Sequence, residues 1–402
     1  MTSAPLSGIR VLEVGVFMAA PFATMQLADL GADVVKVENP EGGEPVRSTG
    51  PFVAGHSSPY LRLNRSKRSV ALDLKSDAGR EAFLRLAAAS DVVVENLRPG
   101  AMRRLGLGYD EVRALNPGVV YASASGFGQD GPLADLPGLD IMAQARGGLM
   151  SITGTADGEP AKVGVPLCDL VCGIYTALAV TAALRERDTS GEGQYVDVSL
   201  LESAVSLAVW EAGRFFATGE VGGPLGSAHQ SQAPYQAFRT SDGWATLGAI
   251  TPRTWSGLCE VLGLAELEGD ERYVDSSSRH ARREELAAFI EERTAQVSTA
   301  DLVHRLEEMG VPCAPIADYG QVFHDEHLAA RDFFWDAPHP VAGDVRQIGS
   351  PMRFSRTPVQ RAGAGPVLGA DTRAALLEAG YREDEVDALV AAGAARQAEE
   401  AR

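Results

Sequence analysis

The sequence predicts an α/β protein in which a large domain, built on a doubly wound parallel sheet, is joined to a smaller domain. Short apolar segments alternate with segments of helical spacing over the first 130 residues, as expected of βαβ units. The chain has 402 residues, 45% hydrophobic and 22% charged, which is enough for two domains with large cores. A stretch rich in Gly, Ser and Pro, residues 217–234, separates the two parts.

In the first part, short apolar runs predict strands and runs with a period of 3.6 residues predict helices. We expect strands at 9–15, 32–39, 91–96 and 119–128, and helices at 19–31, 77–90 and 110–118. Connections of this kind are right-handed and produce a parallel sheet. Ligands of such sheets bind beyond the carboxyl ends of the strands. Asn39, Arg98 and the loop at Gly126 directly follow strands, so they are expected on that edge.

The later elements follow the same rules. Residues 169–187 predict a helix that is buried, because apolar residues occur on all its sides. Residues 191–216 predict a strand followed by one long helix. In the second part, 298–310 predicts a helix with a Ser/Thr cap at its start and Gly310 at its end.

These elements divide the chain into a large domain of residues 1–216 and a small domain of residues 235–330. Residues 217–234 form a linker between them. The last segment, 331–402, returns to strand and turn after about residue 340 and then forms Ala-rich helices.

Composition argues against several classes of function. The net charge of −18 disfavours a nucleic-acid partner, because such binding depends on neutralising phosphates. We find no apolar stretch approaching the roughly 20 residues that span a bilayer, and no secretory signal at the start, so we expect no membrane and a cytoplasmic location. No metal site or disulfide framework is expected, because no CxxC occurs among the four cysteines, Cys168, Cys172, Cys259 and Cys313.

Basic residues nevertheless gather in two islands. The first, "LRLNRSKRSVALDLK" (61–75), contains Arg62, Arg65, Lys67 and Arg68. The second, "ENLRPGAMRRLG" (95–106), contains Arg98, Arg103 and Arg104. Basic islands in an acidic protein are compatible with a small polyanionic ligand, and equally with solvated surface arginines.

One carboxylate stands at the start of the apolar segment "GVPLCDLVCGIYTALAV" (164–180). Asp169 is open to two interpretations that are compatible. Asp is a favoured helix cap, and a carboxylate that is held at a helix N-terminus but stripped of water is a usable nucleophile. Asp140, in "LPGLDIMAQA", raises the same question, and there we expect a cap of the following helix with the side chain directed away from Asp169.

Other motifs are weak. "GFGQDG" (126–131) fits G-x-G-x-x-G but leads into a turn rather than a helix, so a nicotinamide enzyme is only a minor alternative. No G-x-S-x-G elbow is present, which disfavours an α/β-hydrolase. The pair His324 and His327 lies on a polar segment and does not indicate a metal site.

Taken in order along the chain, a set of segments resembles the family III CoA-transferases, the superfamily of formyl-CoA transferase and α-methylacyl-CoA racemase. These segments are "AAPFATMQLADLGADVVKVE", "LNRSKRSVALDLK", "VVVENLRPGAMRRLGLGY", "NPGVVYASASGFGQDGP", "GLMSITG", "DLVCGIYTALAVTAAL", "GEGQYVDVSLLE" and "LGADTRAALLEAGY". The resemblance implies a Rossmann-like large domain completed by residues 340–402, a smaller α+β domain, an active-site loop at 217–234 and an interlocked, ring-like homodimer. It also implies two substrates, an acyl-CoA and a free carboxylic acid, with coenzyme A transferred from one acid to the other. It further implies that Asp169 is the nucleophile.

The resemblance further implies which residues meet the ligands. Residues expected near coenzyme A are Met18, Ala19, Asn39, Leu72, Asp73, Lys75, Asn96, Leu97, Arg98, Arg104, Leu139 and Asp140. Residues expected near the substrate in the linker loop are Gly226, Ser227 and His229. Asn39 departs from formyl-CoA transferases, which carry a basic residue there, so Arg47 or a residue in 62–68 is the expected replacement.

Two departures bear on the reaction. The racemases of the superfamily have a histidine where this chain has Leu139, which cannot exchange a proton. The segment 226–238 lacks the glycine run of formyl-CoA transferases, which disfavours oxalate and formate, and "GGLMSITG" resembles members that act on small dicarboxylates. The sequence therefore predicts a CoA-transferase working through a covalent Asp169 intermediate. A racemase or epimerase and a non-catalytic CoA-binding protein remain the alternatives.

Overall fold

The computed structural model describes residues 4–398, which form two compact units. The large unit comprises the chain up to Leu149, Lys162–Gly213 and the chain from His327 onward. The small unit comprises Met150–Ala161 and Arg214–Glu326. The units differ from the expected boundaries in three places. Met150–Ala161 belongs to the small unit, the crossing begins at Arg214 rather than at residue 217, and the return begins at His327 rather than at residue 331.

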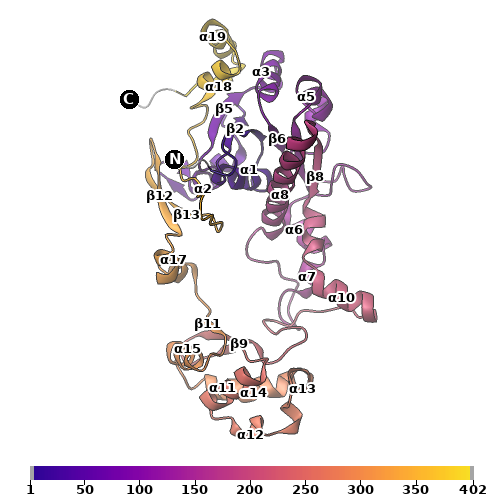
Figure 1. Ribbon diagram of the computed structural model, residues 1–402, viewed down its shortest axis with the longest axis vertical. Helices are drawn as coiled ribbons and strands as arrows, with labels where there is room; N and C mark the ends of the chain where they lie inside the picture. The colour runs from indigo at the N-terminus through magenta and orange to yellow at the C-terminus, as the bar shows by residue number, and fades with distance from the viewer. Residues whose placement is uncertain (1–3, 399–402) are drawn as a thin grey trace. The chain divides into compact units, whose positions relative to one another are not determined.

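A seven-stranded sheet forms the centre of the large unit (Figure 1). Its order is β14 (Ala395–Arg396), β5 (Arg68–Leu72), β2 (Asp33–Glu38), β1 (Arg10–Val14), β6 (Val92–Glu95), β7 (Val120–Ser125) and β8 (Tyr195–Ser199). All pairs are parallel except β14 with β5. Following the chain, the strands run outward from β1 in one direction and then from β6 in the other, which is the doubly wound order.

Helices cover both faces of this sheet. Those of the large unit are α1 (Ala19–Asp29), α2 (Ser58–Leu63), α3 (Asp77–Ala88), α4 (Ala101–Arg104), α5 (Tyr109–Leu115), α6 (Asp140–Arg146), α8 (Leu167–Ser190), α9 (Leu200–Ser206), α18 (Thr372–Glu378) and α19 (Glu383–Ala391), with the 3₁₀ turn η1 (Pro45–Ser48). Three further helices cross the unit boundaries, namely α7 (Leu149–Ile152), α10 (Val209–Thr218) and α17 (Glu326–Ala330).

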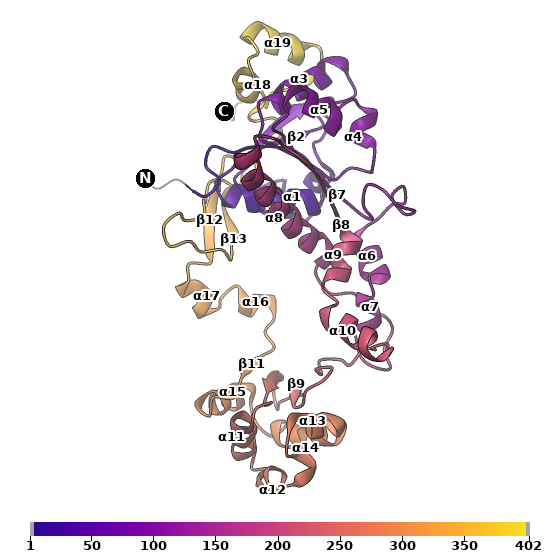
Figure 2. The ribbon, with the colours of Figure 1, turned by 45° about the vertical axis from the view of Figure 1, so that its right-hand side comes forward.

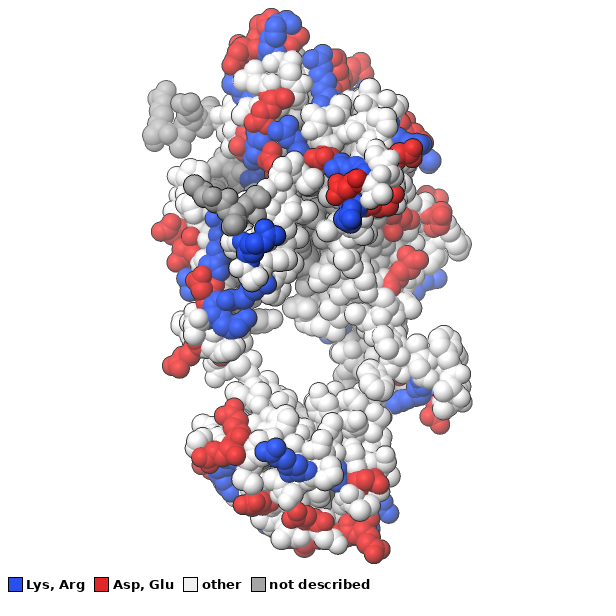
Figure 3. Space-filling view, in the orientation of Figure 1, with Lys and Arg blue, Asp and Glu red and all other residues white. Residues whose placement is uncertain are grey.

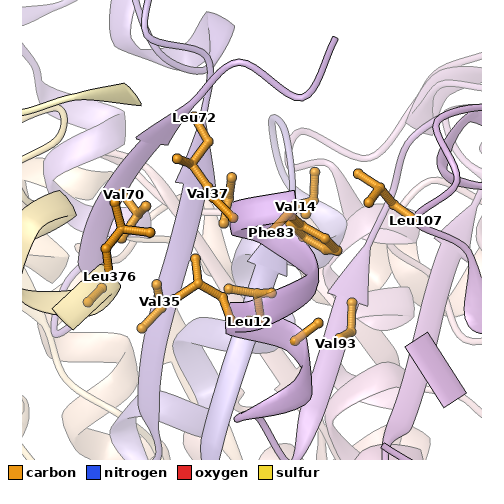
Figure 4. Close-up of a cluster of buried hydrophobic side chains, with 14 of the residues drawn as sticks. Leu12, Val14, Val35, Val37, Val70, Leu72, Phe83, Val93, Leu107 and Leu376 are labelled. Atoms are coloured by element: carbon orange, nitrogen blue, oxygen red, sulfur yellow. The ribbon is translucent and has the colours of Figure 1, made fainter. Parts of the chain in front are cut away.

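Alternation along the strands divides the core between the two faces. Leu12 and Val14 of β1 pack with Phe83 of α3, in the cluster that also contains residues of α5 and α18 (Figure 4). Val11, directly before Leu12 in the strand, faces the opposite way and packs with residues of α1 and α8, such as Val180. Figure 2 shows α3 and α5 on one side of the sheet and α1 and α8 on the other.

The helix α8 differs from its prediction in two ways. It is buried on one side only, and it exposes Ile174, Tyr175 and Leu178, the last to 60%. With 24 residues and a mean hydropathy of 1.9 over its most apolar window, it is long and apolar enough to cross a membrane, so our expectation that no such stretch exists is wrong. The core helix of a soluble protein passes the same test, and α8 packs along α1 and against β7 and β8.

Two small hairpins complete the large unit, β3 (Phe52–Val53) with β4 (His56–Ser57), and β12 (Phe334–His339) with β13 (Gly343–Ile348). The long helix expected before residue 216 is instead two helices, α9 and α10, because the chain leaves helical geometry at 207–208.

The small unit is an α+β arrangement with its own core. Its antiparallel sheet has the order β11 (Cys313–Pro315), β10 (Trp244–Gly248) and β9 (Tyr235–Arg239). Its helices are α11 (Pro252–Leu262), α12 (Ala265–Glu268), α13 (Ser276–Ala281), α14 (Arg283–Thr294), α15 (Thr299–Glu308) and α16 (Tyr319–Val322), with the 3₁₀ turn η2 (Glu271–Tyr273). As predicted, a serine caps α15, since Ser298 accepts a hydrogen bond from Asp301 N, and Gly310 follows the helix with a φ of +68°.

Most of the first basic island is used inside the large unit. The Lys67 ammonium lies 2.8 Å from Glu13 and is fully buried with it, and Arg65 forms a bidentate pair with Asp29. Arg68 pairs with Asp33 and with Glu378, 310 residues away. These three side chains therefore stabilise the fold, and their charges are not available to a ligand. On the face in Figure 3, basic and acidic side chains are interspersed, without one large basic field.

Candidate active site

The N-terminus of α8 is capped from another helix. The residue before α8, Pro166, provides no side-chain cap. Instead, Oδ1 of Asp140 accepts hydrogen bonds from Cys168 N at 2.8 Å and Asp169 N at 3.3 Å, while its Oδ2 accepts one from Gln144 Nε2 at 2.7 Å. Two expectations are therefore wrong: Asp169 is the third residue of the helix rather than its cap, and Asp140 serves α8 and is directed toward Asp169.

The side chain of Asp169 is left without a compensating partner. Its carboxylate is partly buried and accepts no hydrogen bond from any residue in the described part of the chain, 4–398. Burial, and secondarily the negative charge of Asp140, raise the pKa of Asp169 from an ordinary 3.8 to about 7. Such a carboxylate is both ionisable at neutral pH and poorly hydrated, which favours reactivity.

Asp169 lies where two cavities of the large unit meet. The first, which we call the edge cavity, has a volume of about 360 Å³ and is lined from the turns that follow β1, β6 and β7. The second, the apolar cavity, has a volume of about 1000 Å³ and is lined mainly by hydrophobic side chains. Four residues line both cavities: Phe17, Met18, Leu139 and Asp169. A group bound in either cavity would therefore face the same carboxylate.

The edge cavity occupies the position that the strand order dictates. After β1 and β6 the chain departs in opposite directions, which leaves a crevice between their carboxyl ends. The turn after β1 is braced across this crevice, because the Asn96 side chain accepts from Val16 N at 2.8 Å and donates to Val16 O at 2.9 Å. Phe17 has a φ of +57°, unusual for a bulky residue, and its N–H donates to Glu44.

Two glycines allow the chain to close the far side of the edge cavity. A Cβ atom on Gly126 would lie 2.8 Å from Gly138 Cα, and a Cβ on Gly138 would lie equally close to Gly126 Cα. The loop after β7 and the segment before α6 therefore touch through their backbones. This contact gives "GFGQDG" a packing role in place of a dinucleotide role.

The predicted ligand residues fall into two groups. Those that line the edge cavity with Asp169 are Met18, Ala19, Asn96, Leu97, Arg98 and Leu139. Those that lie on the same carboxyl edge, after β2, β5 and β6, but outside the lining of this cavity are Asn39, Leu72, Asp73, Lys75 and Arg104. Within the second group the Leu72 side chain is buried in the core, so only its backbone can meet a ligand there.

Free positive charge remains on this edge for an anionic ligand. Lys75, Arg98 and Arg104 form no ion pair within residues 4–398. Arg47, one of the expected replacements for the missing base at Asn39, is instead bound by Glu38 through both Nε and Nη2 and stacks on Tyr60. Asn39 itself is exposed, and its side chain accepts a local hydrogen bond from Glu41 N.

The predicted substrate residues, Gly226, Ser227 and His229, belong to the small unit. Gly226 adopts a φ of +62° and donates to Gly154 O, and Ser227 accepts from Ala237 N. The His229 ring stacks on Tyr235 with centroids 5.0 Å apart. Within the described ranges no group of three or more His, Cys, Asp or Glu residues could hold a metal ion.

Two features of the site were not predicted from the sequence: the capping of α8 by Asp140, and the apolar cavity with Arg62 on its wall. One signal pointed to the first of these. "GVPLCDL" has no Ser, Thr, Asn or Asp ahead of its first helical turn, so a cap from elsewhere was required. The apolar cavity is lined by side chains spread from residue 17 to residue 351, so no local sequence pattern predicts it.

Comparison with known proteins identifies relatives of this chain along nearly its whole length. A family model described as CoA-transferase family III matches residues 6–372. The chain is 36% identical to the mouse succinyl-CoA:glutarate CoA-transferase over 98% of this chain and 91% of that protein. It is 38% identical to the Haloarcula hispanica succinyl-CoA:mesaconate CoA-transferase over 93% and 96%, respectively. A crystal structure of a CaiB/BaiF family protein from Brucella suis superimposes with a TM-score of 0.85 and 36% identity, covering 94% of this chain and all of that one. The chain therefore belongs to CoA-transferase family III and is an enzyme of that family.

Proposed function

We propose that Asp169 is the covalent nucleophile with which this protein moves CoA from an acyl-CoA to a free carboxylic acid. A carboxylate oxygen of Asp169 attacks the thioester carbonyl carbon, the C–S bond breaks, and CoA leaves as the thiolate. The thiolate then attacks Cγ of Asp169 in the mixed anhydride. This second step forms an aspartyl-CoA thioester and releases the donor acid as its carboxylate.

The acceptor acid reverses the sequence. Its carboxylate oxygen attacks the aspartyl thioester, and the thiolate leaves to give the anhydride of Asp169 with the acceptor. Attack of the thiolate on the acceptor's carbonyl carbon then yields the new acyl-CoA and regenerates the Asp169 carboxylate. No net proton is consumed, and no metal is required.

The observation that carries the proposal is the position of an unpaired carboxylate at the junction of two cavities. The thiol end of CoA needs one approach to this group, and an acyl chain needs another. Apolar walls limit the access of water, which would hydrolyse the anhydride. We further propose that the nucleotide follows the carboxyl edge of the sheet, with its phosphates near Lys75, Arg98 and Arg104. Binding energy gained there is available at the reacting carbon.

We also propose that the protein acts as a homodimer in the cytoplasm. Large apolar side chains are exposed on α8 and α10, including Leu178, Trp210 and Phe216, the last exposed to 84%. Such patches are usual at permanent interfaces. Sedimentation at nanomolar concentration tests this, since a stable and active monomer would contradict it.

Replacement of Asp169 by Ala tests the proposed chemistry. We expect transfer to fall by several orders of magnitude while the affinity for desulfo-CoA stays close to that of the wild type. Asp188→Ala, at the exposed end of the same helix, is the matched control and should retain activity. Transfer by Asp169→Ala within about tenfold of the wild type would refute the assignment. Loss of optical purity with deuterium uptake by a 2-methylacyl-CoA would favour the racemase alternative instead, despite Leu139.

A further inference from the structure

The apolar cavity contains positive charge that the fold does not neutralise. Three cations line it, Arg62, Arg65 and Lys162. Arg65 is buried in its bidentate pair with Asp29. Arg62 and Lys162 form no ion pair with any residue between 4 and 398, and Lys162 donates only to Val163 O.

Arg62 keeps part of its guanidinium group free to bind an anion. Its Nη1 donates to Ser58 O at 3.0 Å and to Ser58 Oγ at 2.6 Å, one helical turn earlier in α2. Nε and Nη2 make no hydrogen bond within the described residues, so one edge of the planar fork stays unused. The side chain is half-buried, and this burial lowers the pKa of Arg62 because no carboxylate compensates it. A cation in this position is stabilised when a ligand supplies the missing negative charge.

The carboxylates of the same cavity do not meet that need. The two that line it are Asp140 and Asp169. Asp140 accepts hydrogen bonds from the first turn of α8 and from Gln144. In the proposed function, Asp169 attacks the carbonyl carbon of the acyl group. The rest of the cavity wall is mainly apolar and includes Phe22, Met25, Leu63, Phe333 and Ile348. Such a wall suits a short methylene chain.

We propose that Arg62, assisted by Lys162, binds the distal carboxylate of the acyl group, so that the enzyme selects dicarboxylic over monocarboxylic acids. This inference rests on the proposed function, because it takes Asp169 as the point at which the other carboxyl group reacts. Arg62 lies on the wall of the apolar cavity, whereas the free cations assigned to the CoA phosphates lie on the sheet edge. One set of cations thus binds the phosphates of the acyl-CoA, and the other binds the distal carboxylate of its acyl group.

A competition between matched acids measures this selection directly. Glutarate and valerate have the same five-carbon skeleton and differ only in the distal group. When both are offered at equal concentration with one acyl-CoA donor, the ratio of product thioesters equals the ratio of their kcat/KM values. This ratio does not depend on the donor half-reaction or on the fraction of active enzyme. We expect the wild type to favour glutarate by roughly 100-fold or more.

Variants of Arg62 should then lose this preference. Arg62→Met should lower the ratio by about 10- to 150-fold, as expected for one charge-assisted hydrogen-bonded pair. Arg62→Lys keeps the charge without the fork and should retain an intermediate ratio. Lys162→Met should have a smaller effect, because Lys162 is exposed. Arg113→Met, on the exposed face of α5 and outside both cavities, is the control and should leave the ratio unchanged.

The outcomes separate the inference from the function on which it rests. If the wild type makes no thioester from any acid, the proposed function fails. If it transfers CoA but treats glutarate and valerate alike, or if Arg62→Met keeps the wild-type ratio, only the inference fails. A fall in desulfo-CoA affinity in Arg62→Met, with the product ratio intact, would show that Arg62 binds the nucleotide and would also overturn it.

Discussion

Replacement of Asp169 by Asn should abolish transfer and at the same time stabilise the protein at neutral pH. The raised pKa of Asp169 means that the folded protein binds a proton there more tightly than the unfolded chain does. Below pH 4 the group is protonated in both states and does not affect stability. As pH rises from about 4 to about 7, the unfolded chain loses this proton first, so the group progressively destabilises the fold.

The size of this effect follows from the shift. A rise from 3.8 to about 7 corresponds to about 4 kcal/mol at pH 8, as an upper value, because water that enters the cavities reduces it. For a unit of more than 250 residues each kcal/mol changes Tm by about 2 °C. The Tm of Asp169→Asn should therefore exceed that of the wild type by up to several degrees at pH 8, and by little at pH 4.

Thermal unfolding followed by circular dichroism across pH 4–8 provides the measurement. Asp188→Asn is the matched control, since it changes an exposed carboxylate on the same helix, and its Tm should track that of the wild type. If the difference in Tm between Asp169→Asn and the wild type does not grow with pH, Asp169 does not carry the unfavourable charge that we assign to it.

Three further predictions concern the surroundings of the site. Asp140→Asn removes a negative neighbour, so the pKa of Asp169 should fall and the pH midpoint of kcat/KM should move to lower pH; an unchanged or higher midpoint would contradict the electrostatic coupling. Gly126→Ala should destabilise by about 1–3 kcal/mol, because its Cβ meets Gly138 Cα, whereas Gly213→Ala, with open space around it, should be neutral or slightly stabilising in chemical denaturation. Lys67→Met should cost about 3–5 kcal/mol, since it leaves the buried Glu13 carboxylate short of one partner, and a loss below about 1 kcal/mol would show that the buried pair is dispensable.

The parallel sheet could be predicted because its signals are local. Strands β1, β2, β6 and β7 are short apolar runs, and helices α1, α3 and α5 have their own periodicity and end signals. The edge position of the site follows from the parallel arrangement alone. Strand β5 was missed because its apolar residues lie inside a basic segment, and β14 because two residues carry no detectable period.

Long-range pairing accounts for most of what the sequence could not reveal. Arg68 looked like part of a phosphate site, yet its partner Glu378 is 310 residues away. Asp140 looked like a cap of its own helix, yet it caps α8, 28 residues later. In both cases a charged residue has several possible partners, and only the fold decides between them. The exposed side of α8 could not be foreseen either, because its composition is apolar all round.

Trapping the acyl-enzyme tests the central claim most directly. The enzyme is incubated with an acyl-CoA without acceptor acid, treated with hydroxylamine and digested, and its peptides are sequenced by mass spectrometry. An anhydride or thioester of Asp169 should be converted to the hydroxamate, and only when acyl-CoA is present. A hydroxamate at Asp140 or another carboxylate, or none under conditions in which the wild type transfers CoA, would contradict the role of Asp169.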